Sequence, residues 1–280
     1  MSRIETDETG PTAAGGAAGL VRRRPLTAFV VLAFGLSWGF WLLSFATSSP
    51  VLFFLGGLGP AMAAAIVAWQ LGTLQPWLAR VLRWRVSPWF YAFAVGFPIL
   101  LYAVPNIVAA VFGASPDLSL AGERLPAYAV TWVSALFLGG LEEPGWRGFA
   151  LPRLQRRYTP VRATLLLGVV WGLWHLPVEP LAIVVTVPLA FFYTWLFNRT
   201  GSALLCVVLH ASITPAQDHL TLVADSPVVD AAILGTLIVV AVGFVVATRG
   251  RLGLADSAAG HDAPAEPDDG TSADTGQRRP

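Results

Sequence analysis

Hydrophobic stretches, each close to the length of a membrane span, alternate with short polar segments along most of this chain. A helix needs about 20 apolar residues to cross the hydrocarbon core of a bilayer. Eight segments approach that length, at approximately 26–47, 51–72, 88–112, 126–147, 162–180, 181–198, 201–217 and 228–248. The pattern predicts an all-α fold, a polytopic membrane protein with about eight transmembrane helices.

Polar segments rich in small residues flank this hydrophobic part at both ends. We expect residues 1–24 and 251–280 to be disordered cytoplasmic tails, because such sequences cannot bury enough apolar surface to fold. The transmembrane domain between them spans 25–250. The first apolar run follows Arg22, Arg23 and Arg24 but is longer than the hydrophobic part of a signal peptide, so we predict an uncleaved first helix.

Charged residues are divided unevenly between the predicted loops. Arginines cluster near residues 22–24, 80–85, 153–162, 199 and 249–251, which all fall on one side if the spans are correct. The loops on the other side carry mainly aspartate and glutamate. Cytoplasmic loops are enriched in basic residues, so both termini are predicted to be cytoplasmic, with the protein in the cell membrane.

Composition agrees with this membrane assignment. The chain is 55% hydrophobic and 12% charged, with a mean hydropathy of +0.63, whereas soluble domains carry about 25% charged residues. A net charge of +1 gives no electrostatic basis for binding nucleic acid. The lone Cys206 excludes a disulfide framework. All 18 basic residues are arginine, and alanine is abundant, which fits a bacterial origin.

Residues 75–86 have the pattern of a short amphipathic helix. Arg80 and Arg83 share one side, with tryptophan and leucine on the rest. This pattern is typical of a helix that lies at the membrane interface against anionic lipid. A surface that guides substrate is the alternative.

Two adjacent glutamates at the end of an apolar run are the main candidates for chemistry. A carboxylate in hydrocarbon costs about 2.5–3.5 kcal/mol, so a pair there is not explained by stability. Glu143 precedes Arg147 by four residues, the spacing at which a carboxylate and a guanidinium meet on a helix. This pairing leaves Glu142 as the free carboxylate and candidate general base. Pro144 and Gly145 predict a kink. The alternative is an ion pair without chemistry.

Two histidines lie in separate apolar segments. His175 follows Trp171 by four residues, so both side chains lie on one helix face. His210 precedes Thr214 by the same spacing, and we expect the Thr214 hydroxyl beside the imidazole. Each histidine alone is equally well explained as a core residue bonded to a backbone carbonyl. Together with two glutamates, they indicate a proton-handling or hydrolytic site.

Two mechanisms fit these groups. Glu142, His175 and His210 could hold a zinc ion that activates water. Alternatively, Glu142 alone deprotonates water while the histidines or Thr214 stabilise the oxyanion, with no cofactor. The His-Glu-x-x-His motif of soluble zinc proteases is absent from the sequence. Spacing does not choose between the two mechanisms.

With these residues, the chain resembles the CPBP family of intramembrane proteases, which includes the type II prenyl endopeptidases (CAAX proteases) and the bacterial Abi-type membrane proteins. The resemblance runs from about residue 125 to 217 and rests on three motifs. The first motif is Glu-Glu-x-x-x-Arg, matched by Glu142, Glu143 and Arg147. The second is an aromatic residue four positions before a histidine, matched by Trp171 and His175. The third is His-x-x-x-Asn, which begins at His210 and has Thr214 in place of the asparagine. Phenylalanine is usual where this chain has Trp171.

The resemblance implies a helical membrane fold around a water-filled cavity, in which the first glutamate activates water for peptide hydrolysis. Glu142 would be the base, with Glu143 and Arg147 as its supporting pair. His175 and His210 would be electrostatic or metal-binding partners. Thr214 departs from the pattern, because a hydroxyl reaches an oxyanion differently from an amide.

The leading hypothesis is therefore an intramembrane endopeptidase acting on a membrane peptide or protein within the lipid bilayer. A non-catalytic membrane adaptor of the same family, of the bacteriocin-immunity or secretion type, is the second, and Thr214 favours it. A transporter with a proton relay is the third, although no internal repeat supports it. A prenylated carboxyl terminus is the type II substrate elsewhere in the family, but a bacterial host rarely supplies one, so a short membrane peptide or a propeptide fits equally well.

Overall fold

The computed structural model describes residues 17–113, 121–222 and 227–255, and within these ranges the regular structure is entirely helical. The elements in order are α1 (Ala17–Arg23), α2 (Pro25–Thr47), α3 (Pro50–Gly57), α4 (Gly59–Gln70), α5 (Leu74–Val81), α6 (Pro88–Val111), α7 (Ala121–Leu138), η1 (Gly140–Glu142), α8 (Glu143–Gly145), η2 (Trp146–Ala150), α9 (Leu151–Gln155), α10 (Pro160–Trp174), α11 (Ala182–Thr200), α12 (Ala203–Leu220) and α13 (Pro227–Ala247). The predicted all-α class is confirmed.

The predicted tails lie mostly outside the described residues. Where the sequence predicts a tail up to residue 24, a helix, α1, begins at Ala17. At the other end, the described chain stops at residue 255, within the predicted tail of 251–280.

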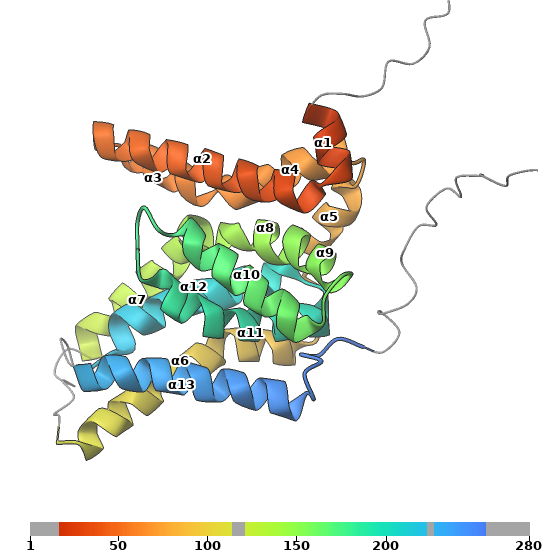
Figure 1. Cartoon of the computed structure of the whole chain (residues 1–280). Helices are drawn as coiled ribbons and strands as arrows, with labels where there is room; N and C mark the ends of the chain where they lie inside the picture. Colours follow the sequence, from red (N-terminus) through yellow and green to blue (C-terminus); the bar gives the residue numbers. More distant parts are fainter. Residues whose placement is uncertain (1–16, 114–120, 223–226, 256–280) are drawn as a thin grey trace, which may run out of the picture.

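The helices are arranged so that the acidic segment lies inside the bundle (Figure 1). α2, α3 and α4 form an outer layer, in which α2 packs against both partners, and α4 also packs on α8. α10, α11 and α12 lie in the middle, where α10 packs on α11 and α12 packs on η1 and α8. α6 and α13 pack together and cover the opposite side. The segment from η1 to η2 is therefore enclosed between α4 and α12.

The described helices include fewer complete spans than the sequence predicts. Five stretches are long and apolar enough to cross a membrane, and α3 with α4, bent by 50°, gives a sixth if the pair is one span. Each of the eight predicted segments corresponds to helical structure, but α10 has only 15 residues and α12 is not among the candidates. A polytopic membrane protein is supported, and the count of eight is not confirmed.

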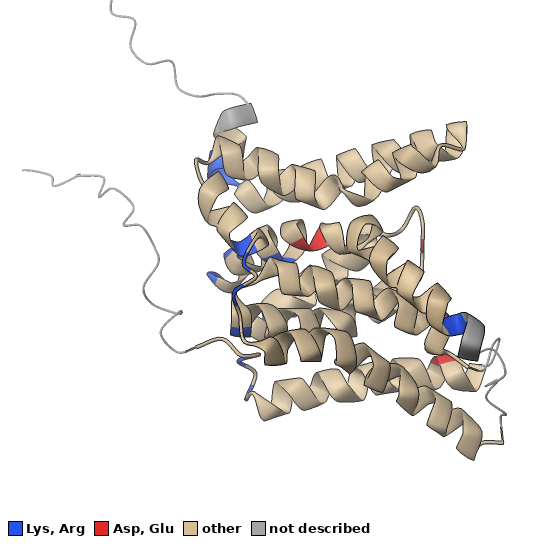
Figure 2. Cartoon of the chain, turned by 180° about the vertical axis from the view of Figure 1, so that it is seen from behind, with Lys and Arg blue, Asp and Glu red and all other residues tan. Residues whose placement is uncertain are grey.

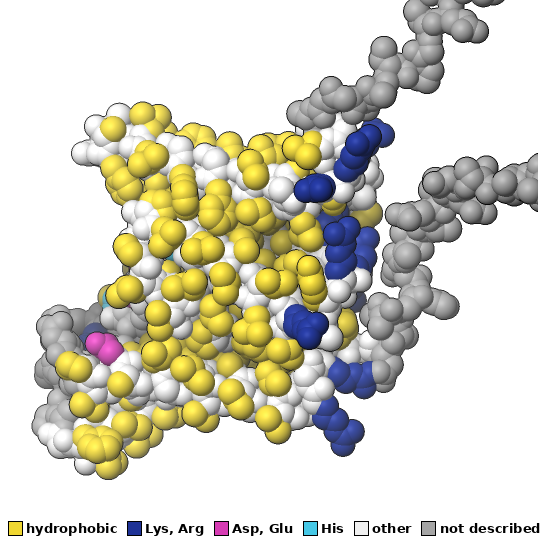
Figure 3. Space-filling model, in the orientation of Figure 1, with side chains coloured by type: hydrophobic (Ala, Val, Ile, Leu, Met, Phe, Trp, Pro, Cys, Tyr) yellow, Lys and Arg dark blue, Asp and Glu magenta, His cyan; other side chains and the backbone are white. Residues whose placement is uncertain are grey.

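The surface of the bundle has the character expected of a protein surrounded by lipid. Large hydrophobic side chains such as Val31, Trp69 and Val239 are about two-thirds exposed, and Figure 3 shows hydrophobic side chains spread over the face of the bundle in view. Arginines gather at one end of it (Figure 3). This grouping agrees with the predicted alternation of charge along the chain, while the side of the membrane that this end faces stays a prediction.

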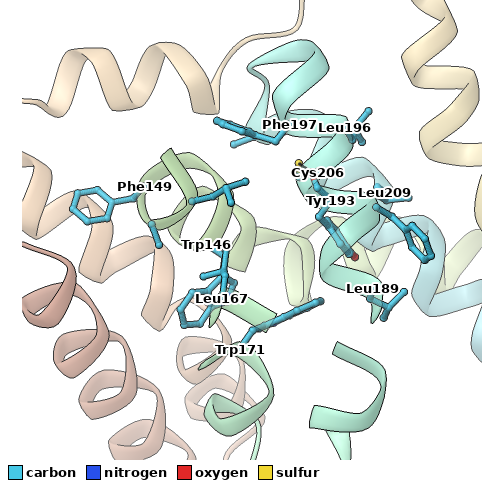
Figure 4. Close-up of a cluster of buried hydrophobic side chains, with 14 of the residues drawn as sticks. Trp146, Phe149, Leu167, Trp171, Leu189, Tyr193, Leu196, Phe197, Cys206 and Leu209 are labelled. Carbon is cyan, nitrogen blue, oxygen red and sulfur yellow. Dashed lines mark hydrogen bonds between the residues drawn. The ribbon is translucent and has the colours of Figure 1, made fainter. Parts of the chain in front are cut away.

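A cluster of buried side chains fixes the middle of the bundle (Figure 4). Its labelled members come from η2, α10, α11 and α12, and they include Trp146, Phe149, Leu167, Trp171, Tyr193 and Leu209. Between helices in a bilayer such side chains contribute through van der Waals packing rather than through removal of apolar surface from water. The helices that carry the glutamate and histidine motifs are thus held together by this shared core.

Candidate active site

The acidic motif lies where a long apolar helix is broken. α7 ends at Leu138, and the chain continues through one turn of 3₁₀-helix, a short α-helical turn and the π-helical turn η2. π-helical turns occur frequently at functional sites. Glu142 is 5% exposed and Glu143 is fully buried, and the acidic segment of ribbon lies within the bundle in Figure 2. The predicted kink is therefore a change of helix type that places both carboxylates in the interior.

Glu143 and Arg147 form the predicted ion pair. One guanidinium nitrogen, Nη1, donates to both carboxylate oxygens of Glu143, at 2.8 and 2.9 Å, and both side chains are fully buried. The guanidinium also contacts two aromatic rings, 4.4 Å from the ring centroid of Trp171 and 4.2 Å from that of Tyr193. These rings pack edge to face against each other, with centroids 5.5 Å apart. Such cation–π contacts gain strength when they are desolvated, so both rings help to hold the ion pair in place.

His210 is the third member of this group. Its Nδ1 lies 3.2 Å from Glu143 Oε1, and because a carboxylate accepts, Nδ1 carries the proton that it donates. The other ring nitrogen lies beside Gly139, where an added Cβ would come 3.1 Å from His210 Nε2. Glu143 therefore joins the first and third motifs and holds the imidazole so that Nε2 lies near the turn that leads into Glu142.

Glu142 has different partners from its neighbour. Its Oε2 accepts a hydrogen bond of 2.8 Å from the indole Nε1 of Trp171. His175, His210 and Glu143 are near enough to influence its charge. Among the described residues it forms no ion pair with an arginine. The sequence identified Glu142 as the free carboxylate, and in the structure it is free of arginine but oriented by an indole.

His175 lies at the end of α10, where its ring is held by its own helix. Nδ1 is 2.9 Å from the backbone carbonyl of Trp171 and donates to it. The ring packs edge-on against Trp174, with the centroids 4.7 Å apart. With Nδ1 occupied, Nε2 is the nitrogen available for a ligand or a proton.

Thr214 is placed differently from the expectation that its hydroxyl lies beside the imidazole of His210. Its Oγ1 donates to the backbone carbonyl of His210, over 3.4 Å, within α12. A threonine hydroxyl commonly bonds back to the carbonyl four residues earlier in a helix. In this rotamer the Thr214 hydroxyl is bonded to a carbonyl of its own helix and does not present a donor to Glu142.

The residues proposed for zinc do not form a three-ligand site in this structure. Within 17–113, 121–222 and 227–255, no group of three His, Cys, Asp or Glu side chains is arranged to hold a metal ion. The Nδ1 atoms of both histidines are already engaged, by Trp171 O and by Glu143 Oε1. These contacts leave Nε2 of each imidazole free, as in histidines that bind a metal through that atom. Zinc binding by Glu142, His175 and His210 therefore stays a prediction, and no step of the proposed mechanism uses it.

Sequence reasoning missed two aromatic residues and one close backbone contact. Tyr193 stacks on Arg147, and Trp77 of α5 donates from Nε1 to the carbonyl of Pro144 over 2.9 Å. A Cβ at Gly145 would lie 2.5 Å from the carbonyl oxygen of Pro60. The amphipathic pattern of 75–86 predicted a helix, and α5 covers Leu74–Val81, but the pattern did not predict that Trp77 is buried against the acidic segment. No pattern in the sequence marks Tyr193.

The comparisons with known proteins match the region that contains these motifs. Residues 124–214 match the Rce1-like family, described as type II CAAX prenyl endopeptidase Rce1-like. The chain is also 27% identical over 131 residues to CAAX prenyl protease 2 of Methanococcus maripaludis, an alignment covering 39% of this chain and 48% of the relative. The chain thus matches about half the length of this curated relative. The family match and the relative together support the CPBP family for this chain.

Proposed function

We propose that this chain is an intramembrane endopeptidase that hydrolyses a peptide bond of a membrane-associated peptide or protein. The observation that carries the proposal is the division of roles between two adjacent buried glutamates. Glu143 is neutralised by Arg147 and bonded to His210, whereas Glu142 is oriented by Trp171 and pairs with no arginine of the described residues. A carboxylate held in this way suits a general base.

In the proposed reaction Glu142 takes a proton from a water molecule, and the oxygen of that water attacks the carbonyl carbon of the scissile peptide. The carbonyl π electrons move onto oxygen, and the tetrahedral oxyanion forms. The Nε2 atoms of His175 and His210 are the ones not engaged by Trp171 O or Glu143. With Nε2 also protonated, each imidazolium would donate to the oxyanion and stabilise its developing charge. The intermediate then collapses, the C–N bond breaks, and the proton held by Glu142 passes to the leaving amine.

The substrate is proposed from the relative and from the surroundings of the site. The relative is named a CAAX prenyl protease, so a lipid-modified carboxyl-terminal segment is one candidate. The buried position of the glutamates within an apolar bundle equally suits an unmodified membrane peptide or a propeptide that enters from the bilayer.

A second candidate, a non-catalytic membrane adaptor of the same family, is favoured by Thr214. Its hydroxyl is engaged by the carbonyl of His210, so the donor that asparagine supplies elsewhere in the family is replaced by a group bonded to its own helix.

One experiment separates the two candidates. Peptide termini are compared in membranes from cells that make the native chain or the Glu142→Gln variant, which keeps the volume and removes the base. Glu179→Gln is the matched control, because Glu179 is exposed and lies outside the site. New termini that appear with the native chain and the control and disappear with Glu142→Gln support proteolysis. Identical profiles at equal protein abundance support the adaptor.

A further inference from the structure

Three arginines come together at the arginine-rich end of the bundle, away from the glutamates. Arg80 lies in α5, Arg153 in α9 and Arg156 directly after α9. Arg80 and Arg153 are each half-buried, and each is repelled by Arg156 and loses hydration through burial. Like charges gathered at a partly desolvated position destabilise the protein unless an anion compensates them.

No carboxylate of the described residues compensates this cluster. Glu142 and Glu143 are interior and engaged within the site. Glu179, Asp218 and Asp230 lie in or beside the connections at the other end of the helices, and Figure 2 shows no acidic segment of ribbon at the end where most of the basic segments gather. None of the three arginines forms an ion pair with a residue that the structure describes. Burial and Arg156 together lower the pKa of Arg80, as expected of a cation without a partner.

One member of the cluster, Arg153, is also structurally fixed. Arg153 donates from Nη1 to the carbonyl of Phe149 at 3.0 Å and from Nη2 to Thr73 Oγ1 at 3.5 Å. Its guanidinium lies 3.6 Å from the centroid of the Phe149 ring. Thr73 directly precedes α5, so these contacts connect the start of α5 with α9. A positive group that is already immobilised binds an anion with little further loss of conformational entropy.

We infer that Arg80, Arg153 and Arg156 form a binding site for the phosphate of an anionic membrane phospholipid. Guanidinium groups bind phosphate through charge-assisted hydrogen bonds, and basic clusters beside membrane helices attract anionic headgroups. Figure 3 shows arginines of this chain gathered at the edge of the exposed apolar surface, the level at which lipid headgroups would lie. The lipid links α5 to α9 and so supports the position of Trp77, which donates to the carbonyl of Pro144.

The test compares two double variants of the full chain in nanodiscs of phosphatidylcholine, with and without phosphatidylglycerol. Arg80→Gln with Arg156→Gln removes two members of the cluster. Arg162→Gln with Arg199→Gln removes the same charge at the same end of the bundle and is the matched control. Bound lipid is counted by native mass spectrometry, and Tm is measured in both lipid compositions. Inorganic phosphate is titrated separately into phosphatidylcholine nanodiscs.

We expect the cluster variant to retain on the order of tenfold less phosphatidylglycerol than the control. We also expect it to lose the increase in Tm that this lipid gives the native chain. Equal lipid retention by the two double variants overturns the site. If inorganic phosphate raises Tm as much as phosphatidylglycerol does, the site binds free phosphate and the proposal of a lipid ligand is overturned. A cooperative thermal transition of both variants in phosphatidylcholine alone shows that both are folded.

Discussion

Trp171 donates its indole N–H to Glu142 over 2.8 Å, so the second motif orients the carboxylate of the first. In the CPBP family, which this chain resembles, phenylalanine is the usual residue at this position. Phenylalanine has no N–H to donate. The aromatic ring itself stacks on the Arg147 guanidinium. One side chain therefore supports both glutamates, through its N–H on Glu142 and through its ring on the partner of Glu143.

Trp171→Phe separates these two roles, because it keeps a ring and removes the N–H. A hydrogen bond to a charged group contributes about 1.5–3 kcal/mol. We expect kcat to fall about tenfold or more with little change in KM, measured on the peptide that the comparison of termini identifies. Trp41→Phe is the control, since it removes an indole donor to the Phe53 carbonyl outside the site. Equal effects of the two substitutions would contradict a specific role for the bond to Glu142.

Arg147→Met leaves the carboxylate of Glu143 buried without its cation. Removing one partner of a buried ion pair costs about 3–5 kcal/mol, so we expect a large loss in the free energy of unfolding, measured by denaturant titration in detergent micelles. Adding Glu143→Gln removes the uncompensated charge and should restore part of that loss. A double variant no more stable than Arg147→Met would show that the ion pair is not the source of the effect.

Gly145→Ala tests the close approach of the acidic segment to α4. Its Cβ would lie 2.5 Å from the backbone carbonyl oxygen of Pro60, which cannot move independently of its helix. We expect a destabilisation of about 1–3 kcal/mol from overpacking, read from thermal unfolding. Gly96→Ala in α6 is the matched control, because nothing lies within 4 Å of its added Cβ, and alanine favours a helix over glycine. If both substitutions had the same effect, the close contact would be refuted.

Trp77→Phe removes the hydrogen bond from α5 to the carbonyl of Pro144, which is buried. An unsatisfied buried acceptor costs about 1–3 kcal/mol, so we expect a loss of that size in the free energy of unfolding. We also expect reduced proteolysis, because Pro144 directly follows Glu143. Trp89→Phe, at a residue that is 67% exposed, is expected to change neither quantity. A neutral Trp77→Phe would show that α5 does not support the site.

Dialysis against a chelator addresses the zinc alternative. The described part of the chain offers no group of three metal-binding side chains, and a stable zinc site uses at least three protein ligands. We expect the proteolytic activity to survive chelation unchanged. Loss of activity that returns when zinc is added would instead show that Glu142, His175 and His210 rearrange around a metal.

The division between what the sequence and the structure decide is clear in the acidic motif. The i, i+4 spacing of Glu143 and Arg147 predicted their ion pair, because residues four apart on a helix are neighbours. The spacing could not predict that His210, from a helix 67 residues away, bonds to the same carboxylate. That contact depends on how α12 packs against η1 and α8.

The sequence by itself determined the helical membrane class, the location of the candidate glutamates and histidines, and the gathering of arginine at one end, because hydrophobic length, motif spacing and charge are local properties of the chain. Only the tertiary structure decided which apolar segments form helices long enough to span a membrane, that Trp77 is buried beside Pro144, and that Thr214 bonds within its own helix. These outcomes follow from packing between distant segments and from rotamer choice, which periodicity does not encode.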